Sequence, residues 1–509
     1  MKPAVRRSIT KCRQCLSKLG RVVGATSFVK PMSVLIASIG VALGLVACHD
    51  AGHSSDVLVF KDHPEPGLQG QNLPKDRPGS ILVKPYQRGV RVVGHSDVWK
   101  RDSNVQLAWV DHCAYIASSS PNFLGWGITA EPETYGVAVI DVSNPMAPRA
   151  VRVLREKGAL YSAEAMAAAQ WEGRKVLVAG TYEGGVQDDY SGWISIYDAT
   201  DCASPTLVAE YRLPEKLHAL TVAPNGKRVY ATSIDPFAGT GGIHVLDITD
   251  LAQPAYLGKF PVTREDGTHF EFATHEVSVS ADESRIYAGV LGSQVGDLNK
   301  GIARFPDPAA FGPNAGGVYI LDNSDVAEGR PNPEMRLLGT AQHAGWHSVM
   351  PASIRGAPYL VAGGELGACP GSWPKLIDIS DETAPLIVGE FKLAMNRSEN
   401  CPPPTAAEQA SGGLVGAPGT ASLHFNDVDS AANTRLGLFQ FMWSGLRIAD
   451  LSNPYAPKEI AYFKPGDACG GHVRYVEESG HIWLSCASSG FYVLELAPAI
   501  KPPASLKNQ

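Results

Sequence analysis

The sequence predicts an all-β fold: a single seven-bladed β-propeller of four-stranded blades, closed by an N-terminal strand that completes the last blade. Three observations lead to this prediction. One strand motif recurs seven times, further strands flank each copy, and an unmatched strand precedes the first complete repeat. The many glycines (52) and prolines (37) suit short strands joined by tight turns.

The repeated motif is an alternating β run that ends in an acidic residue, followed in most copies by a turn that proline closes. Clear examples are GVAVIDVSNPMAP from Gly136 and GLRIADLSNPYAP from Gly445. We expect the acids to be structural, because they lie beside Ser/Thr and Asn/Asp turn residues whose N–H groups they can cap. The equivalent acids of the seven copies are Asp141, Asp198, Asp247, Asp322, Asp378, Asp450 and Glu495.

Each copy of the motif is flanked by further strands. Two precede it, as in LHALTVAPNGKRVYATS (residues 217–233), where a Pro-Asn-Gly turn joins them, and one short strand follows, as in Tyr256–Phe260. Four strands make one blade, and the spacing of the acids, from 45 residues (Asp450 to Glu495) to 75 residues (Asp247 to Asp322), suits a propeller. The alternative arrangement of the same units is an open stack.

These seven copies resemble the LVIVD-repeat family over about residues 88–498. The resemblance implies a β-propeller, since members of that family form propellers. It does not imply one particular activity.

Both ends of the repeat array favour a closed ring. The seventh copy stops at Pro498 without a fourth strand, and residues 89–94 (GVRVVG) read as a fourth strand without a blade. Pairing the two hides a strand edge that would otherwise be open to aggregation. We therefore expect the propeller to span 87–498 and residues 499–509 to form a C-terminal tail.

The N-terminus has the features of an export signal, so residues 1–47 are predicted to be a signal peptide. Val34 to Ala47 are 14 uncharged residues, too few for a membrane helix. The sequence Leu45-Val46-Ala47-Cys48 resembles the lipobox of bacterial lipoproteins, which implies cleavage before Cys48 and its lipidation. An ordinary secretory signal is the alternative. By the same resemblance, His49 after the cysteine favours the outer membrane, with residues 48–86 as a flexible tether between membrane and propeller.

The mature chain would keep six cysteines, an even number that predicts three disulfides in an oxidising compartment. Fifteen pairings are possible in principle. The propeller topology narrows them, because it places the cysteines two by two on the same face of the same or neighbouring blades. The expected pairs are Cys113 with Cys202, Cys369 with Cys401, and Cys469 with Cys486.

Long insertions all fall on one face of the predicted propeller, which we call the top. The loops between first and second strands are short, whereas long ones lie at 118–135, 182–191, 263–274, 291–316 and 394–421. Long loops on a rigid scaffold commonly bind ligands, so a small molecule, a glycan or a protein is expected there; neutral drift is the alternative. A net charge of −7 gives no reason to expect nucleic acid.

Histidine recurs at one position of the repeat, the start of the first strand of each blade. Five of the seven equivalent residues are histidine, although the chain holds only 14 histidines. In a propeller these positions converge on the central channel from distant parts of the chain. The seven residues are Asn104, Glu164, His218, His275, His347, His424 and His472.

This set predicts a metal site, because imidazole nitrogens suit copper and zinc, and Glu164 could add a carboxylate ligand. A tetrahedral site would need donor atoms about 3 to 3.5 Å apart. His269, Glu271 and Glu276 are near His275 in sequence and could extend a polar pocket. The alternative is structural, with each histidine only bonding the next blade.

Two functions remain open. The first is an envelope binding protein whose top face and channel hold a ligand or metal. The second is a copper-type oxidoreductase acting on a small molecule in the channel, since the His-lined channel is distantly similar in architecture to that of the selenium-binding protein and methanethiol oxidase family. Phosphate-binding glycine loops, nucleophile elbows and His-Glu-x-x-His motifs are absent from the sequence.

Overall fold

A computed structural model of the chain separates into two units, Met1–Leu58 and Val59–Gln509. The residues it describes belong to the second unit: 61–65, 85–119, 132–182, 192–233, 242–270, 273–292, 315–342, 346–365, 370–401, 422–466 and 469–500. The predicted signal peptide and Cys48 lie outside these residues, as does most of the long top-face insertions. None of the helices within the described ranges is long and apolar enough to cross a membrane.

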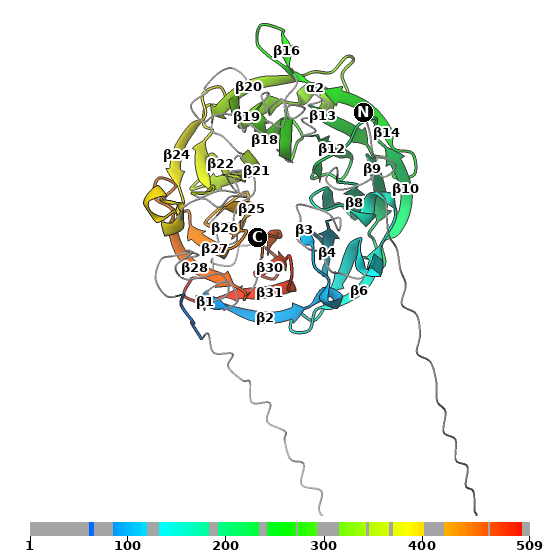
Figure 1. Cartoon of the computed structure of the whole chain (residues 1–509). Helices are drawn as coiled ribbons and strands as arrows, with labels where there is room; N and C mark the ends of the chain where they lie inside the picture. The colour runs from blue at the N-terminus through cyan, green and yellow to red at the C-terminus, as the bar shows by residue number, and fades with distance from the viewer. Residues whose placement is uncertain are drawn as a thin grey trace, which may run out of the picture. The chain divides into compact units, whose positions relative to one another are not determined.

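The described part of the second unit is a β-propeller in which seven antiparallel blades ring a common axis, as predicted (Figure 1). Blade 1 comprises β3 (Asn104–Val110), β4 (Cys113–Ser118), β5 (Val137–Asp141) and β6 (Arg149–Leu154); blade 2 comprises β7 (Met166–Trp171), β8 (Arg174–Gly180), β9 (Trp193–Asp198) and β10 (Thr206–Arg212); blade 3 comprises β11 (Leu220–Val222), β12 (Arg228–Thr232), β13 (Ile243–Asp247) and β14 (Ala255–Phe260).

The remaining four blades repeat this order. Blade 4 comprises β17 (Ala273–Val279), β18 (Arg285–Gly292), β19 (Ala315–Asp322) and β20 (Met335–Gln342); blade 5 comprises β21 (Trp346–Ile354), β22 (Ala357–Gly364), β23 (Lys375–Asp378) and β24 (Leu386–Glu390); blade 6 comprises β25 (Leu423–Val428), β26 (Leu436–Phe441), β27 (Gly445–Asp450) and β28 (Lys458–Lys464); blade 7 comprises β29 (Val473–Val476), β30 (His481–Cys486), β31 (Gly490–Leu496) and β2 (Val90–Ser96).

The hydrophobic core lies between neighbouring blades. One cluster joins Tyr230 and Val245 of blade 3 to Ile286 and Tyr319 of blade 4, all of them buried. The second and third strands of each blade are covered on both faces, which explains why runs such as Val137–Ile140 are apolar throughout and fully buried.

The repeated aspartates have the structural role that the sequence predicts. Asp141 Oδ1 accepts a hydrogen bond of 2.9 Å from the backbone N–H of Ser143, two residues on. The same bond recurs at Asp198, Asp247, Asp322, Asp378 and Asp450. Each aspartate therefore fixes the turn into the fourth strand of its blade. Glu495, the seventh acid, instead forms an ion pair with Arg91 of β2.

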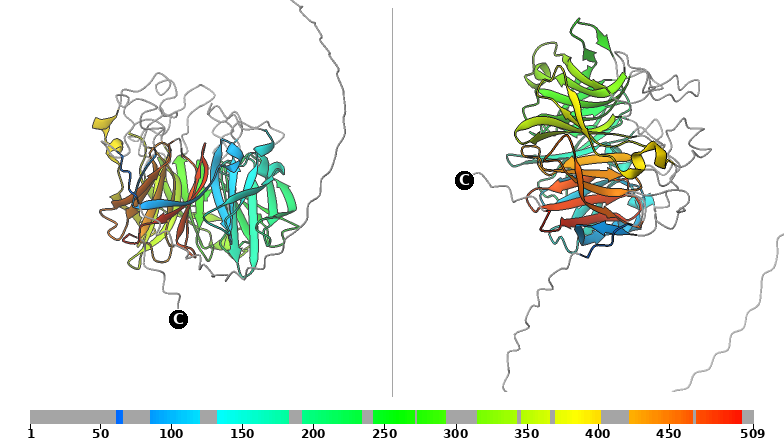
Figure 2. Two further views of the ribbon diagram at one scale, coloured as in Figure 1. Left: turned by 90° about the horizontal axis from the view of Figure 1, so that it is seen from below. Right: turned by 90° about the vertical axis from the view of Figure 1, so that its left-hand side faces the viewer.

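Ring closure also follows the prediction. β2 pairs with β31 in antiparallel register, from Val90 opposite Leu496 to Ser96 opposite Phe491. The N-terminal strand therefore supplies the fourth strand of blade 7, and the open stack is wrong. Figure 2 shows β2 running across the outside of the ring.

The predicted flexible tether, 48–86, differs from what the structure shows at its C-terminal end. β1 (Tyr86–Arg88) pairs with β28 as a fifth strand of blade 6. Upstream, the Glu65 carboxylate accepts hydrogen bonds of 2.6 and 3.0 Å from the fully buried guanidinium of Arg447. Residues 61–65 are thus bound to blade 6, because that guanidinium needs a counter-charge.

Two short strands extend blade 4: β15 (Val262–Thr263) pairs with β20 and with β16 (His269–Phe270).

Two of the three predicted disulfides are present in the described residues. Cys113 is bonded to Cys202, which joins blades 1 and 2, and Cys469 is bonded to Cys486 within blade 7. Cys401 is disulfide-bonded as well, while its predicted partner Cys369 lies outside the described residues.

Candidate metal centre

The predicted histidines are carried by the innermost strands of their blades. His275, His347 and His424 lie near the start of β17, β21 and β25, and Glu164 and His218 lie two residues before β7 and β11. Since the first strand of every blade faces the propeller axis and begins at the same end, these residues from blades 2 to 6 meet there. All five are at least 95% buried.

Glu164 is the residue on which the others converge. Its Oε2 atom lies 3.4 Å from the Nε2 atoms of both His275 and His347, and 3.7 Å from that of His218. Its other oxygen, Oε1, lies 3.3 Å from Nε2 of His424. One carboxylate thus faces four imidazoles from four other blades.

The imidazoles also contact one another in a row. Nε2 of His218 lies 2.7 Å from Nε2 of His275. The ring centroids of His275 and His347 are 3.7 Å apart, and those of His347 and His424 are 4.7 Å apart. The distances from the Glu164 oxygens to the four Nε2 atoms, 3.3 to 3.7 Å, are close to the 3 to 3.5 Å that donor atoms around one ion require.

Glu365 joins this set and was not predicted. Its carboxylate lies 3.7 Å from Nε2 of His347, 3.8 Å from that of His275 and 4.0 Å from that of His424. Glu365 directly follows β22, whose Gly364 is opposite Trp346 at the start of β21. The end of the second strand of a blade therefore lies beside the start of its first strand. An alignment of the repeats at the end of the second strand could have identified Glu365. We call the six residues Glu164, His218, His275, His347, His424 and Glu365 the hub cluster.

The fifth predicted histidine lies at the edge of this cluster. His472 stacks on Phe425, with ring centroids 4.3 Å apart. Among the described residues, two groups bring one ligand atom of each member within 4.8 Å of the others at the hub: Glu164, His275 and His347, and His347, Glu365 and His424. His472 belongs to neither group, and neither does His218, although its Nε2 contacts Glu164 and His275. The predicted ligands that these groups bring together are therefore Glu164, His275, His347 and His424.

Asn104 shows what the structural alternative looks like at the same repeat position. Its side-chain amide donates to the carbonyl oxygens of Ala487 and Cys486 in the neighbouring blade 7. By contrast, Nδ1 of His275, both ring nitrogens of His347 and Oε2 of Glu164 are buried without a hydrogen-bond partner among the described residues. Bonding between blades therefore accounts for Asn104, and in part for His424, whose Nδ1 bonds the carbonyl oxygen of Gly470, but it does not account for His275 and His347.

The three neighbours of His275 behave differently. Glu276 has a buried Oε2 without a partner in the described part of the chain, and burial raises its pKa. His269 bonds Thr263 in the β15–β16 hairpin, which lies at the outer edge of the ring (Figure 1). Glu271 lies outside the described residues. Of the two that are described, Glu276 is placed to extend the polar region around the hub and His269 is not.

The electrostatics favour an ionised Glu164 carboxylate, a neutral His275 and, without a metal ion, a protonated His424. Burial raises the pKa of Glu164, but the imidazoles of His347 and His424 outweigh it and hold the pKa well below its usual value. Burial, with the charges of His347 and His218, lowers the pKa of His275 well below its usual value. Burial alone would lower the pKa of His424, yet Glu164 and Glu365 raise it to about 9. A deprotonated carboxylate and a neutral imidazole are the states that bind metal.

The residues present fit a transition-metal ion. The three imidazoles and two carboxylates of the two ligand groups offer borderline nitrogen and hard oxygen donors, a combination suited to zinc, copper and iron. Oε2 of Glu164 and Nε2 of His347 lie 3.4 Å apart and are both buried without a hydrogen-bond partner in the described residues, and an ion would engage both. A further group, His112 with Cys113 and Cys202, also has its ligand atoms close together, but its two cysteines form a disulfide and offer no thiolate.

Comparisons with known proteins add little to this geometry. No family model and no curated protein matches the chain. Among solved structures, the chain is similar to hydrazine synthase of Kuenenia stuttgartiensis, with 11% sequence identity and a TM-score of 0.47, over 79% of this chain and 97% of that one. Similarity at this level carries no information on function.

Proposed function

We propose that this chain is a metal-binding β-propeller whose hub cluster holds one transition-metal ion, with copper and zinc the favoured identities. The supporting observation is the convergence of Glu164, His275 and His347 from three blades, each with a buried donor atom that lacks a hydrogen-bond partner within the described residues. His424, through its contact with Glu164, and Glu365 are the next potential ligands.

Elemental analysis of the protein purified from its native envelope tests this proposal. The expected result is about one equivalent of a transition metal in the wild type and near zero in a His275→Ala/His347→Ala double variant. His472→Ala is the matched control, because it removes an equally buried histidine of the same repeat position that lies outside both ligand groups. Equal, near-zero metal in all three proteins would contradict the proposal.

A second candidate function, a metal-dependent oxidoreductase, is favoured by one observation. The side chain of Glu365 is 31% exposed, whereas the side chains of Glu164, His275, His347 and His424 are at most 6% exposed. The cluster is therefore open to solvent at Glu365, where a small molecule could approach. A copper ion bound there would supply one-electron chemistry.

Oxygen uptake with small thiols by copper-loaded protein tests this second function. We expect uptake in the wild type and none in the His275→Ala/His347→Ala variant. Metal binding without oxygen uptake in the wild type would leave the binding function and remove the oxidoreductase.

We also propose that the chain is an exported lipoprotein of the LVIVD-repeat type, anchored to the bacterial outer membrane through Cys48, with a small molecule, glycan or protein as its partner at the top face. The disulfides at Cys113–Cys202, at Cys469–Cys486 and at Cys401 support an oxidising compartment. Membrane fractionation of the wild type and Cys48→Ser tests the anchor: the variant should appear in the soluble fraction, and an unchanged distribution would contradict it.

A further inference from the structure

A second cavity lies at the opposite end of the first strands from the hub cluster. Its volume is about 670 Å³, and blades 7, 1, 2 and 3 line it. β3 runs from Asn104, at the hub end, to Val110, next to the turn residues Asp111 and His112 that line the cavity. Seven residues of extended strand span about 20 Å. We call this cavity the lower pocket; the metal centre does not use it.

Two tryptophans and an arginine form one wall of the lower pocket. Arg474 of β29 is directly opposite Trp483 of β30, and its guanidinium lies 5.9 Å from the ring centroid of Trp109 in β3. The Nε of Arg474 donates to the carbonyl oxygen of Leu107, which fixes the guanidinium against blade 1. This wall is rigid because it is bonded across two blades.

One polar atom of this wall lacks a partner. Trp483 is 3% exposed, and its Nε1–H has no hydrogen-bond acceptor among the described residues. Buried donors are nearly always satisfied in folded proteins. The same burial closes this N–H to a ligand, so Trp483 contributes its ring to the wall and not its donor.

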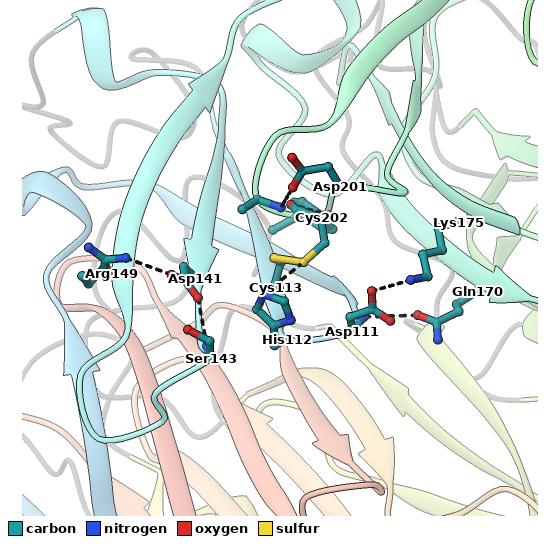
Figure 3. The surroundings of a disulfide bond; sticks show 12 residues. Asp111, His112, Cys113, Asp141, Ser143, Arg149, Gln170, Lys175, Asp201 and Cys202 are labelled. Carbon is teal, nitrogen blue, oxygen red and sulfur yellow. Dashed lines mark hydrogen bonds and ion pairs between the residues drawn. A yellow bond between two sulfur atoms is a disulfide. The ribbon is translucent and has the colours of Figure 1, made fainter. Parts of the chain in front are cut away.

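The rim of the lower pocket is polar and held in place, as Figure 3 shows for blades 1 and 2. Asp111 Oδ2 lies 2.6 Å from Nζ of Lys175, and the Asp111 backbone N–H donates to Oε1 of Gln170. His112 is adjacent to the Cys113–Cys202 disulfide, with its Nε2 3.7 Å from Sγ of Cys202. Rim groups that are already ordered lose little freedom when they bind a ligand.

The charges around the pocket nearly balance. Arg474 faces Asp427, with Nη1 and Oδ1 3.9 Å apart, and Asp111 faces Lys175. An anion would meet the carboxylates of Asp111 and Glu478 at the rim, and a cation would meet Arg474 at the wall. A charged ligand is therefore disfavoured whichever sign it carries.

We propose that the lower pocket binds a neutral, polyhydroxylated ligand, namely a saccharide. A sugar ring offers an apolar face that packs on indole, and hydroxyls that both donate and accept. Those hydroxyls match the acceptors Asp111 and Glu478 and the donors Arg474 and His112. The site is independent of the proposed metal centre, since the two share no residue.

Tryptophan fluorescence and calorimetric titration with neutral disaccharides (maltose, cellobiose, lactose and N,N′-diacetylchitobiose) test the proposal, with glucuronate as the acidic comparator. We expect at least one neutral disaccharide to bind with a Kd of roughly 1 mM or below, and glucuronate to bind at least about tenfold more weakly. The saccharide could be a free sugar or the end of a polysaccharide, and a longer oligosaccharide of the bound type distinguishes the two. Tighter binding of the longer oligosaccharide indicates a polysaccharide end, and equal binding indicates a free sugar; both results are within the proposal.

Four variants give the test its specificity. Trp109→Ala and Asp111→Asn should each weaken binding at least about tenfold; asparagine suits position 111, where φ is 48°. Trp99→Ala removes a tryptophan outside the pocket, 40% exposed, and should leave binding unchanged. The His275→Ala/His347→Ala variant should bind the sugar normally even if it binds no metal. The proposal is overturned if none of the four disaccharides binds below roughly 50 mM, if glucuronate binds as tightly, or if Asp111→Asn binds like wild type.

Discussion

Nε2 of His424 lies 3.3 Å from Oε1 of Glu164, although 260 residues separate the two in sequence. His424 belongs to blade 6 and Glu164 to blade 2, so only closure of the ring brings them together. Glu164 is the one carboxylate at the repeated position, the start of the first strand, and this contact places it opposite the histidines at that position in other blades. It makes Glu164 the residue on which the hub cluster depends.

Replacing Glu164 with glutamine tests that dependence. The amide keeps the shape of the side chain but removes the negative charge, so we expect the affinity for Zn²⁺ or Cu²⁺ to fall by at least about tenfold. Competition with a coloured chelator measures this change. The control is Glu276→Gln, which changes a neighbouring carboxylate that belongs to neither ligand group. A fall in affinity only in the control would show that Glu164 is not a ligand.

The hub cluster could be predicted in part because the propeller has a repeat. Aligning the first strands identifies Glu164, His218, His275, His347 and His424 without any structure. The alignment also selects His472, whose ring stacks on Phe425 instead of joining a ligand group. Equivalent backbone positions fix where a side chain begins, whereas its rotamer depends on neighbours that the repeat does not specify. Glu365 is not in that alignment, because it lies at the end of a second strand.

The turn aspartates predict how stability depends on pH. Hydrogen bonds from Ser143 lower the pKa of Asp141 to about 2, and bonds from Thr200 lower the pKa of Asp198. Because the folded-state pKa is below the unfolded value of about 3.9, the stabilisation is complete above that pH and is lost as pH falls towards about 2. The urea midpoint of unfolding should therefore fall between about pH 4 and pH 2.

Two substitutions at Asp141 separate charge from hydrogen bonding. Asp141→Asn keeps an acceptor oxygen for the turn and should flatten the pH dependence slightly at little cost near pH 7. Asp141→Ala removes the acceptor and should lower the free energy of unfolding by about 1 kcal/mol. Identical unfolding curves for the alanine variant and the wild type would contradict the structural role of this residue.

The docked N-terminal segment predicts a large effect from a residue far outside the repeats. Glu65→Gln leaves the fully buried Arg447 without its main counter-charge and should lower the free energy of unfolding by about 3 kcal/mol. The matched control, Glu334→Gln, alters an ion pair with Arg336 whose side chains are 41% and 45% exposed, and should cost less than about 0.5 kcal/mol. Equal effects of the two variants on urea unfolding would show that residues 61–65 do not stabilise the propeller.

This segment also shows where prediction of the fold from sequence ended. The blades and the closure by β2 follow from repeats, which record strand pairing in a pattern. The docking of residues 61–65 depends on the ion pair of Glu65 with Arg447 in β27 and on isolated bonds such as the bridge between His63 and Gln87. An ion pair of that kind leaves no periodic pattern in the sequence. The composition of the stretch is then the only signal, and it indicates a flexible tether.

The two disulfides with both partners described should differ in their contribution to stability. Cys113–Cys202 closes a loop of 89 residues and Cys469–Cys486 one of 17. Chain-entropy estimates are about 4.6 and about 3.1 kcal/mol, so the first should stabilise the protein more, by about 1.5 kcal/mol. Urea unfolding of the Cys113→Ser/Cys202→Ser and Cys469→Ser/Cys486→Ser variants measures the difference. A larger loss from the second pair would contradict this order.

The central claim is that first strands from separate blades build one metal centre, and X-ray absorption spectroscopy of the metal-bound protein tests it most directly. The claim predicts a single ion with at least two imidazole ligands and one carboxylate oxygen at about 2.0 to 2.2 Å. It also predicts that the imidazole scattering disappears in the His275→Ala/His347→Ala variant. A spectrum without imidazole scattering, or one that this double substitution leaves unchanged, would contradict the claim.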